Sequence, residues 1–186
     1  MNLSKRLIPM LIHAMSNKIP QNADLVSRPS LPLIIVSSDK KQVEYAAGLT
    51  PPQWLGVGTN VGLNIGAVGR YIELTIDDSN NVNRSITIGV TYNLGQGGGS
   101  TGCWQYAATG ETRGPGGYKK YGSAYGVGDR VGVLVRKNGT LNEIYFYKNG
   151  VNQGLAYSDL PNLVYFTISF YLNNNIHFLK ASLQSV

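Results

Sequence analysis

The chain has 186 residues, including 23 Gly and 12 Tyr, and only 14% of its residues are charged. Long surface helices usually bring many Glu and Lys residues, so this composition favours strands and turns over helices. The net charge of +6 comes from having only 10 acidic residues, and the basic residues form short pairs rather than the stripe expected along nucleic acid.

Two further features limit the class of protein. No apolar run is long enough to span a bilayer. Cys103 is the only cysteine, so no intramolecular disulfide can form. Disulfides are typical of oxidising compartments, and we therefore expect an intracellular, cytoplasmic protein, with the virion or the mitochondrion as alternatives.

Residues 1–30 are predicted to be an N-terminal arm and connector, either helical or extended. The arm begins with basic and apolar residues, and we expect it to dock on this domain or on a neighbour; a mitochondrial-type targeting segment is the alternative. The expected docking residues are Leu7, Ile8, Leu11 and Ile12. Prolines then lead to the apolar residues 33–36, and the domain is predicted to cover residues 31–186.

From Gly69 onward the pattern alternates between strands and turns. Residues 71–76 are predicted to form a strand that ends in a polar loop at 77–81, and residues 85–92 alternate in the same way. Asn138-Gly139 and Asn149-Gly150 supply positive φ at low cost. They predict two successive hairpins between residues 130 and 155.

Several motifs in this part of the chain resemble those of the SPRY family. They are residues 69–74, 88–90, 103–106, 121–132, 144–150 and 154–157. The resemblance covers residues 69–172 well and 33–68 loosely. It implies an all-β fold, a two-sheet antiparallel β-sandwich similar to concanavalin-type lectins, whose loops at one end bind peptide segments or folded partners.

Large aromatic residues in these motifs have a structural explanation. Trp104, Phe146 and Phe170 have the size needed to fill the space between two sheets about 10 Å apart. We therefore predict that all three lie in the core.

Catalytic motifs find little support. His13 and His177 are the only histidines, so a His-based metal cluster is not expected. Residues 98–102 fit Gly-x-Ser-x-Gly, and Gly97, Gly99 and Gly102 fit Gly-x-Gly-x-x-Gly, but the sequence predicts a strand after them where either site needs a helix. We predict no catalytic residues, no cofactor and no metal.

Loops are the remaining candidates for function, because a rigid sandwich positions them while their sequence is free to vary. The three conspicuous ones are residues 92–102, 107–123 and 173–175. Tyr and Arg often supply binding hot spots. The resemblance implies a partner-binding rim, which we expect to consist of Tyr92, Tyr106, Arg113, Tyr118, Tyr171 and Asn173.

The function predicted from the sequence is therefore a non-catalytic protein–protein interaction module that binds a partner protein through these loops. One alternative is a structural or accessory subunit of a large assembly, such as a virus particle or organellar complex, anchored by its arm. A lectin-like carbohydrate-binding domain is a further alternative, although the sequence lacks the carboxylate-rich metal site of such lectins. Nucleic acid is not expected as a specific ligand.

Overall fold

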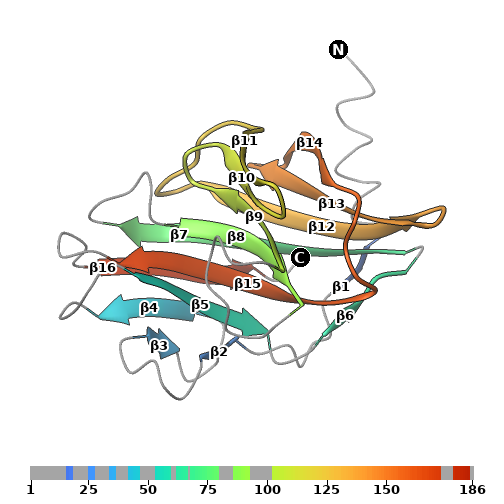
Figure 1. The fold of residues 1–186 in the computed structure, drawn as a ribbon. Helices are drawn as coiled ribbons and strands as arrows, with labels where there is room; N and C mark the ends of the chain where they lie inside the picture. The colour runs from blue at the N-terminus through green and yellow to red at the C-terminus, as the bar shows by residue number, and fades with distance from the viewer. Residues whose placement is uncertain are drawn as a thin grey trace, which may run out of the picture.

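The computed structural model describes residues 16–18, 25–27, 34–36, 42–46, 53–59, 62–66, 68–79, 86–92, 102–172 and 178–184, and only the backbone at 16–55, 77–79, 170–172 and 178–184 within these ranges. The described residues form strands and turns without a helix, which confirms the all-β prediction (Figure 1). In these ranges no helix is long and apolar enough to cross a membrane.

The strands are β1 (Ser16–Lys18), β2 (Leu25–Ser27), β3 (Ile34–Val36), β4 (Gln42–Ala46), β5 (Gln53–Thr59), β6 (Leu63–Asn64), β7 (Gly69–Ser79), β8 (Ile86–Thr91), β9 (Cys103–Ala107), β10 (Glu111–Gly114), β11 (Gly117–Lys120), β12 (Arg130–Asn138), β13 (Leu141–Lys148), β14 (Val151–Tyr157), β15 (Leu163–Leu172) and β16 (Phe178–Gln184).

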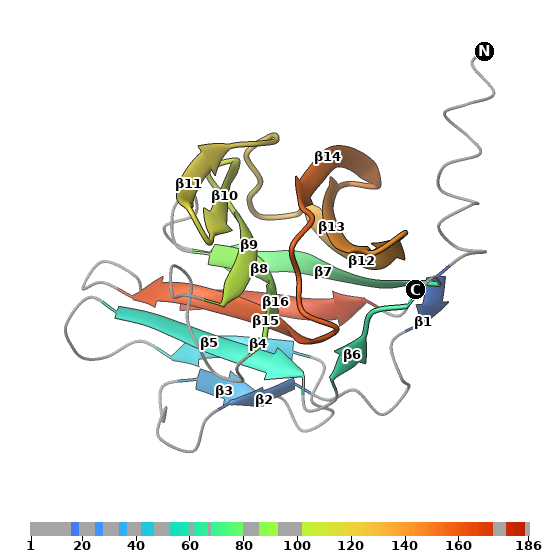
Figure 2. The ribbon, with the colours of Figure 1, turned by 45° about the vertical axis from the view of Figure 1, so that its right-hand side comes forward.

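Two eight-stranded sheets make up the fold. The first has the order β14-β13-β12-β7-β16-β4-β3, with β1 also on β7, and the second has the order β11-β10-β9-β8-β15-β5-β2, with β6 also on β15. Neighbouring strands are antiparallel except for β1, which runs parallel to β7. The predicted two-sheet antiparallel sandwich is confirmed (Figure 2).

Part of the predicted arm belongs to these sheets. Its strands β1 and β2 pair with β7 and β5, respectively. The expected docking residues Leu7, Ile8, Leu11 and Ile12 lie outside the described residues.

The core lies between the two sheets and follows the two-residue period of each strand. In β7, Ile72, Leu74 and Ile76 are buried and belong to one large apolar cluster with residues of β8, β9, β13 and β15. Trp104 and Phe146 belong to the same cluster, as predicted. The side chain of Phe170 is not among those described.

Both predicted hairpins are present in the first sheet. Asn138 pairs with Leu141 across the first turn, and Lys148 pairs with Val151 across the second. In the second turn both Asn149 and Gly150 have positive φ, 50° and 78°, which is the geometry that Asn-Gly favours because it matches the twist of the flanking strands.

The predicted loop at residues 77–81 is wrong in part. Strand β7 continues to Ser79, where it pairs with Leu179 of β16, and a register shift between Lys180 and Ala181 accommodates the extension. The partner strand is distant in sequence, and its pairing supplies hydrogen bonds that local polar composition does not reveal.

Candidate protein-interaction surface

Four aromatic rings pack at the junction between the two sheets. Tyr106 of β9 lies with its ring centroid 5.4 Å from Phe146 of β13, 5.4 Å from Tyr121 and 5.1 Å from Tyr125. We call Tyr106, Tyr121, Tyr125 and Phe146 the tyrosine junction. It joins the segment that follows β11 to the β13–β14 hairpin.

Tyr106 was expected on the binding rim, but its exposed fraction is 0%. The physical reason is strand alternation, since Trp104 and Tyr106 are separated by one residue of β9 and therefore face the same side of the sheet. A buried ring does not contact a partner, so Tyr106 supports the surface from beneath and is not part of the rim.

The hydroxyl of Tyr121 bridges the two sheets at an irregular place. Register shifts on both sides of Tyr145 interrupt the β13–β14 ladder, and Phe146 has no pairing partner in β14. The Phe146 N–H donates to the Tyr121 hydroxyl at 3.2 Å, and that hydroxyl donates to the carbonyl of Gly154. Burial raises the pKa of Tyr121 to about 12, so the hydroxyl keeps its proton at neutral pH.

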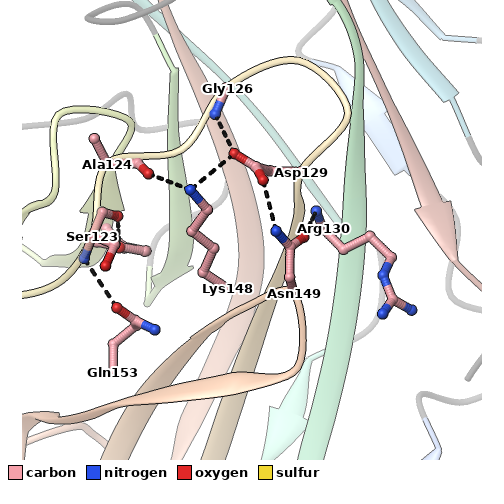
Figure 3. A network of polar contacts seen from close by, with 9 residues as sticks. Ser123, Ala124, Gly126, Asp129, Arg130, Lys148, Asn149 and Gln153 are labelled. Carbon is pink, nitrogen blue, oxygen red and sulfur yellow. Dashed lines mark hydrogen bonds and ion pairs between the residues drawn. The ribbon is translucent and has the colours of Figure 1, made fainter.

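Beside the tyrosine junction, an aspartate holds the loop that precedes β12 (Figure 3). The Asp129 carboxylate accepts from Gly126 N–H at 2.9 Å and Asn149 Nδ2 at 2.7 Å, and forms an ion pair with Lys148 at 3.2 Å. Burial alone raises the pKa of Asp129, but these hydrogen bonds and the Lys148 charge outweigh it and lower the pKa below its usual value.

The same loop is fastened to β13 and β14. Lys148 Nζ donates to the carbonyl of Ala124 at 2.6 Å, and Ser123 N–H donates to Gln153 Oε1 at 3.0 Å (Figure 3). These bonds fix the position of the chain that leaves β11. The β10–β11 hairpin is therefore anchored at its base, next to the β13–β14 hairpin (Figure 2).

Residues 107–123, expected as a loop, contain the β10–β11 hairpin instead. Arg113 pairs with Tyr118 and Gly114 with Gly117, which leaves Pro115 and Gly116 as the turn. Pro fixes its own φ, and Gly116 has a φ of 87° that other residues rarely adopt. The Pro-Gly pair between two short polar stretches was the sequence signal for this hairpin.

Arg113 and Tyr118 are brought together on this hairpin. The Arg113 guanidinium carbon lies 4.8 Å from the centroid of the Tyr118 ring, and Tyr118 is 59% exposed. Since Thr112 pairs with the buried Tyr106, Arg113 and Tyr118 lie on the outer face of the second sheet.

Two lysines follow Tyr118 and complete what we call the hairpin surface: Arg113, Tyr118, Lys119 and Lys120. All residues of β11 are exposed. Glu111 pairs with Lys120 in the backbone register, but its carboxylate accepts from the Thr109 hydroxyl. Among the described residues, no carboxylate lies within ion-pair distance of Lys119 or Lys120, whereas Arg130, Arg136 and Lys148 have such partners. Lys119 and Lys120 thus give the hairpin surface positive charge that no described carboxylate neutralises.

The other expected rim residues lie elsewhere. Tyr92 follows β8, is 50% exposed and lies with its ring centroid 6.4 Å from that of Trp104. No ring contact joins Tyr92 to Tyr118 among the described side chains. Tyr171 belongs to β15 and pairs with Trp54, but its side chain is not described, and Asn173 lies outside the described residues.

A metal centre has no candidate in the described ranges, where no group of three His, Cys, Asp or Glu residues gathers. Taken together, the fold and surface define a two-layer β-sandwich protein with an anchored, exposed and cationic hairpin at one edge of a sheet.

This chain belongs to the SPRY domain family, whose family model matches residues 70–182. SPRY domains are generally protein-interaction modules and are typically non-catalytic. No curated protein sequence matches the chain.

Solved structures share the fold. The SPRY domain of human HERC1 is 19% identical with a TM-score of 0.69, and the match covers 87% of this chain and 98% of that one. The TRIM65 PSpry domain is 16% identical with a TM-score of 0.63 and 98% coverage of both chains. A further human SPRY domain is 20% identical with a TM-score of 0.60, covering 82% and 94%, respectively. At these identities the likeness concerns the fold alone.

Proposed function

We propose that this protein is a non-catalytic module that binds a partner protein, and that the hairpin surface makes the contact. The observation that carries the proposal is the Arg113–Tyr118 pair, an exposed ring with a guanidinium group over its face. Tyr and Arg are enriched at the energetically dominant positions of interfaces because they combine large contact area with hydrogen bonding.

Rigidity at the base of the hairpin supports the same proposal. A surface that is already ordered loses less conformational entropy when a partner binds. The carbonyl of Gly110 accepts from both Tyr121 N–H at 3.1 Å and Gly122 N–H at 2.9 Å, which closes the base of the hairpin. The tyrosine junction and the Asp129 contacts then connect this base to β13 and β14.

The arm and the extent of the domain belong to this proposal as well. Because β1 lies along β7 and β2 along β5, we propose that the arm completes the sheets of its own domain. This arrangement favours an interaction module. The alternative, a subunit of a large assembly, would use its arm to bind a neighbouring subunit instead. We also propose an intracellular site of action, because a single cysteine, here the buried Cys103, cannot form the intramolecular disulfides typical of oxidising compartments.

The test compares proteins captured from a cell extract by the full chain and by the double variant Arg113→Ala/Tyr118→Ala. Tyr118 is exposed and Arg113 is partly buried, so urea unfolding is used to verify that the double variant remains folded. We expect at least one protein to be retained by the wild type and lost with the variant, and to bind the wild type directly once purified.

The matched control is Lys137→Ala/Leu141→Ala, which removes one cationic and one exposed apolar side chain from the β12–β13 hairpin. It should retain the same proteins as the wild type. If all captured proteins bind the wild type and both variants equally, the hairpin surface is not the binding site and the proposal fails.

A further inference from the structure

Strand β11 is the edge strand of the second sheet. Its four residues are exposed, and no other described strand pairs with its outer edge. In antiparallel pairs, residues alternate between positions bonded to the neighbouring strand and positions whose N–H and C=O point away from it. The Tyr121 N–H donates to Gly110 O, so this pair is a bonded position. The alternation therefore directs the N–H and C=O groups of Tyr118 and Lys120 toward the free edge.

The neighbouring edge strand of the first sheet, β14, differs from β11 in a way that matters for strand pairing. Register shifts break its ladder with β13, and Gly154 has a φ of 109°. Side chains of β14 also form hydrogen bonds with its own backbone. Gly154 N–H donates to Asn152 Oδ1 at 2.7 Å, and Gln153 Nε2 donates to Val151 O at 2.9 Å. Bulges of this kind protect a sheet edge from further pairing, so β14 is closed and β11 is open.

Charge limits what the open edge accepts. Lysines on an edge strand repel other strands that carry positive charge and so discourage nonspecific pairing. The same lysines attract a strand that carries carboxylates, which makes the edge selective rather than closed. Lys119 and Lys120 lie on opposite faces of the strand, and Lys120 shares its face with Arg113 and Tyr118.

We propose that β11 binds an extended acidic segment of a partner protein as an added antiparallel strand. This inference rests on the proposed function, because it specifies how the hairpin surface contacts its partner. Tyr118 and Lys120 supply the backbone hydrogen bonds. The partner residues that bond to them have side chains on the same face as Tyr118 and Lys120, where the Lys120 charge favours carboxylates, and the Tyr118 ring packs against the residue beside it.

The test uses an eight-residue peptide of alternating glutamate and threonine, titrated into the full chain at low ionic strength while backbone amide resonances are followed by NMR. A lysine–threonine peptide of the same length is the charge control. In an antiparallel strand with its glutamates over Lys120, the glutamate N–H groups point at β11 and the threonine N–H groups point away.

Methylating the peptide nitrogens therefore separates strand addition from charge attraction. Methylation of the glutamate nitrogens should weaken binding about thirtyfold, because two hydrogen bonds of about 1 kcal/mol each are lost, while methylation of the threonine nitrogens should change it less than about twofold. The amide resonances of Tyr118 and Lys120 should shift most. The lysine–threonine peptide should cause no shifts.

Charge-reversed variants complete the experiment. Lys119→Glu/Lys120→Glu should weaken binding about tenfold, and Lys137→Glu, a reversal on another exposed strand, less than about twofold. Equal binding of the two methylated peptides overturns strand addition. If the double reversal still weakens binding in that case, the hairpin surface of the proposed function stands; if it does not, both fail.

Discussion

Tyrosine serves two different purposes in two adjacent regions of this molecule. In the tyrosine junction, each hydroxyl is bonded to the main chain of a segment distant in sequence, as when Tyr125 donates to the carbonyl of Tyr106 at 2.9 Å. On the hairpin surface, Tyr118 is exposed and its ring lies against the Arg113 guanidinium. The first arrangement joins two sheets, and the second leaves an aromatic face available.

Residue type alone therefore does not tell whether a tyrosine stabilises the fold or is available to a partner. The hydrogen-bond partners of its hydroxyl and the face of the strand on which it lies do. Burial also raises the pKa values of Tyr106 and Tyr125, so these phenols remain neutral hydrogen-bond donors. Substitutions in the tyrosine junction should therefore affect stability, and those on the hairpin surface should affect binding alone.

The largest effect is expected for Tyr106→Ala. Removing a fully buried ring that contacts three others leaves a cavity, and such changes typically cost about 3–5 kcal/mol. Urea unfolding followed by circular dichroism measures the loss. Tyr118→Ala is the control from the exposed region and should stay within about 0.5 kcal/mol of the wild type. Equal destabilisation by the two variants would contradict the division between the regions.

The sequence predicted much of the fold because the relevant signals are local. The two Asn-Gly hairpins and the apolar alternation of β7 depend on nearest neighbours in the chain, and both are present. The end of β7 was misplaced because its pairing partner, β16, lies far along the chain.

The site was predicted less well, although two of its errors had a detectable signal. Placing Trp104 in the core already implied that Tyr106 faces the core too, because alternate residues of a strand share a face. The Pro115-Gly116 turn likewise indicated a hairpin. By contrast, the role of Tyr121 depends on a bulge between two other strands, and no local pattern in the sequence reveals that contact.

An intermediate effect is expected for Tyr121→Phe, which keeps the ring and removes only the bridging hydroxyl. The Phe146 N–H and the Gly154 carbonyl lose their partner, and a partly buried unsatisfied group costs about 1–3 kcal/mol. Tyr118→Phe is the matched control and should cost almost nothing, because no hydrogen bond of its hydroxyl is among the described contacts. Urea unfolding measures the free energy of unfolding of both variants. Equal decreases in the two variants would mean that the two hydroxyls contribute equally to stability.

The smallest effect is expected at low pH. Acid should loosen the loop that precedes β12, which Asp129 holds, and leave the β10–β11 hairpin in place. The folded state lowers the pKa of Asp129, so it binds fewer protons there than the unfolded chain does. Its contribution is therefore complete above the usual aspartate pKa of about 4 and is lost as the pH falls below it. Asp129→Asn should cost about 1 kcal/mol at neutral pH and reduce the fall in unfolding free energy between about pH 6 and pH 3.

Glu143 provides the comparison that makes this pH effect assignable. Hydrogen bonds from Asn138 and Tyr145, together with Arg136, outweigh burial and lower its pKa too, so it contributes to the same acid dependence from the outer face of the first sheet. Hydrogen exchange separates the two carboxylates. At low pH the Gly126 amide, which donates to Asp129, should lose protection in the wild type and in Glu143→Gln but show no further loss in Asp129→Asn. The Lys119 amide, paired with β10, should keep its protection throughout. Loss of protection at Lys119 together with Gly126 would mean that the Asp129 contacts hold the hairpin and the loop as one unit.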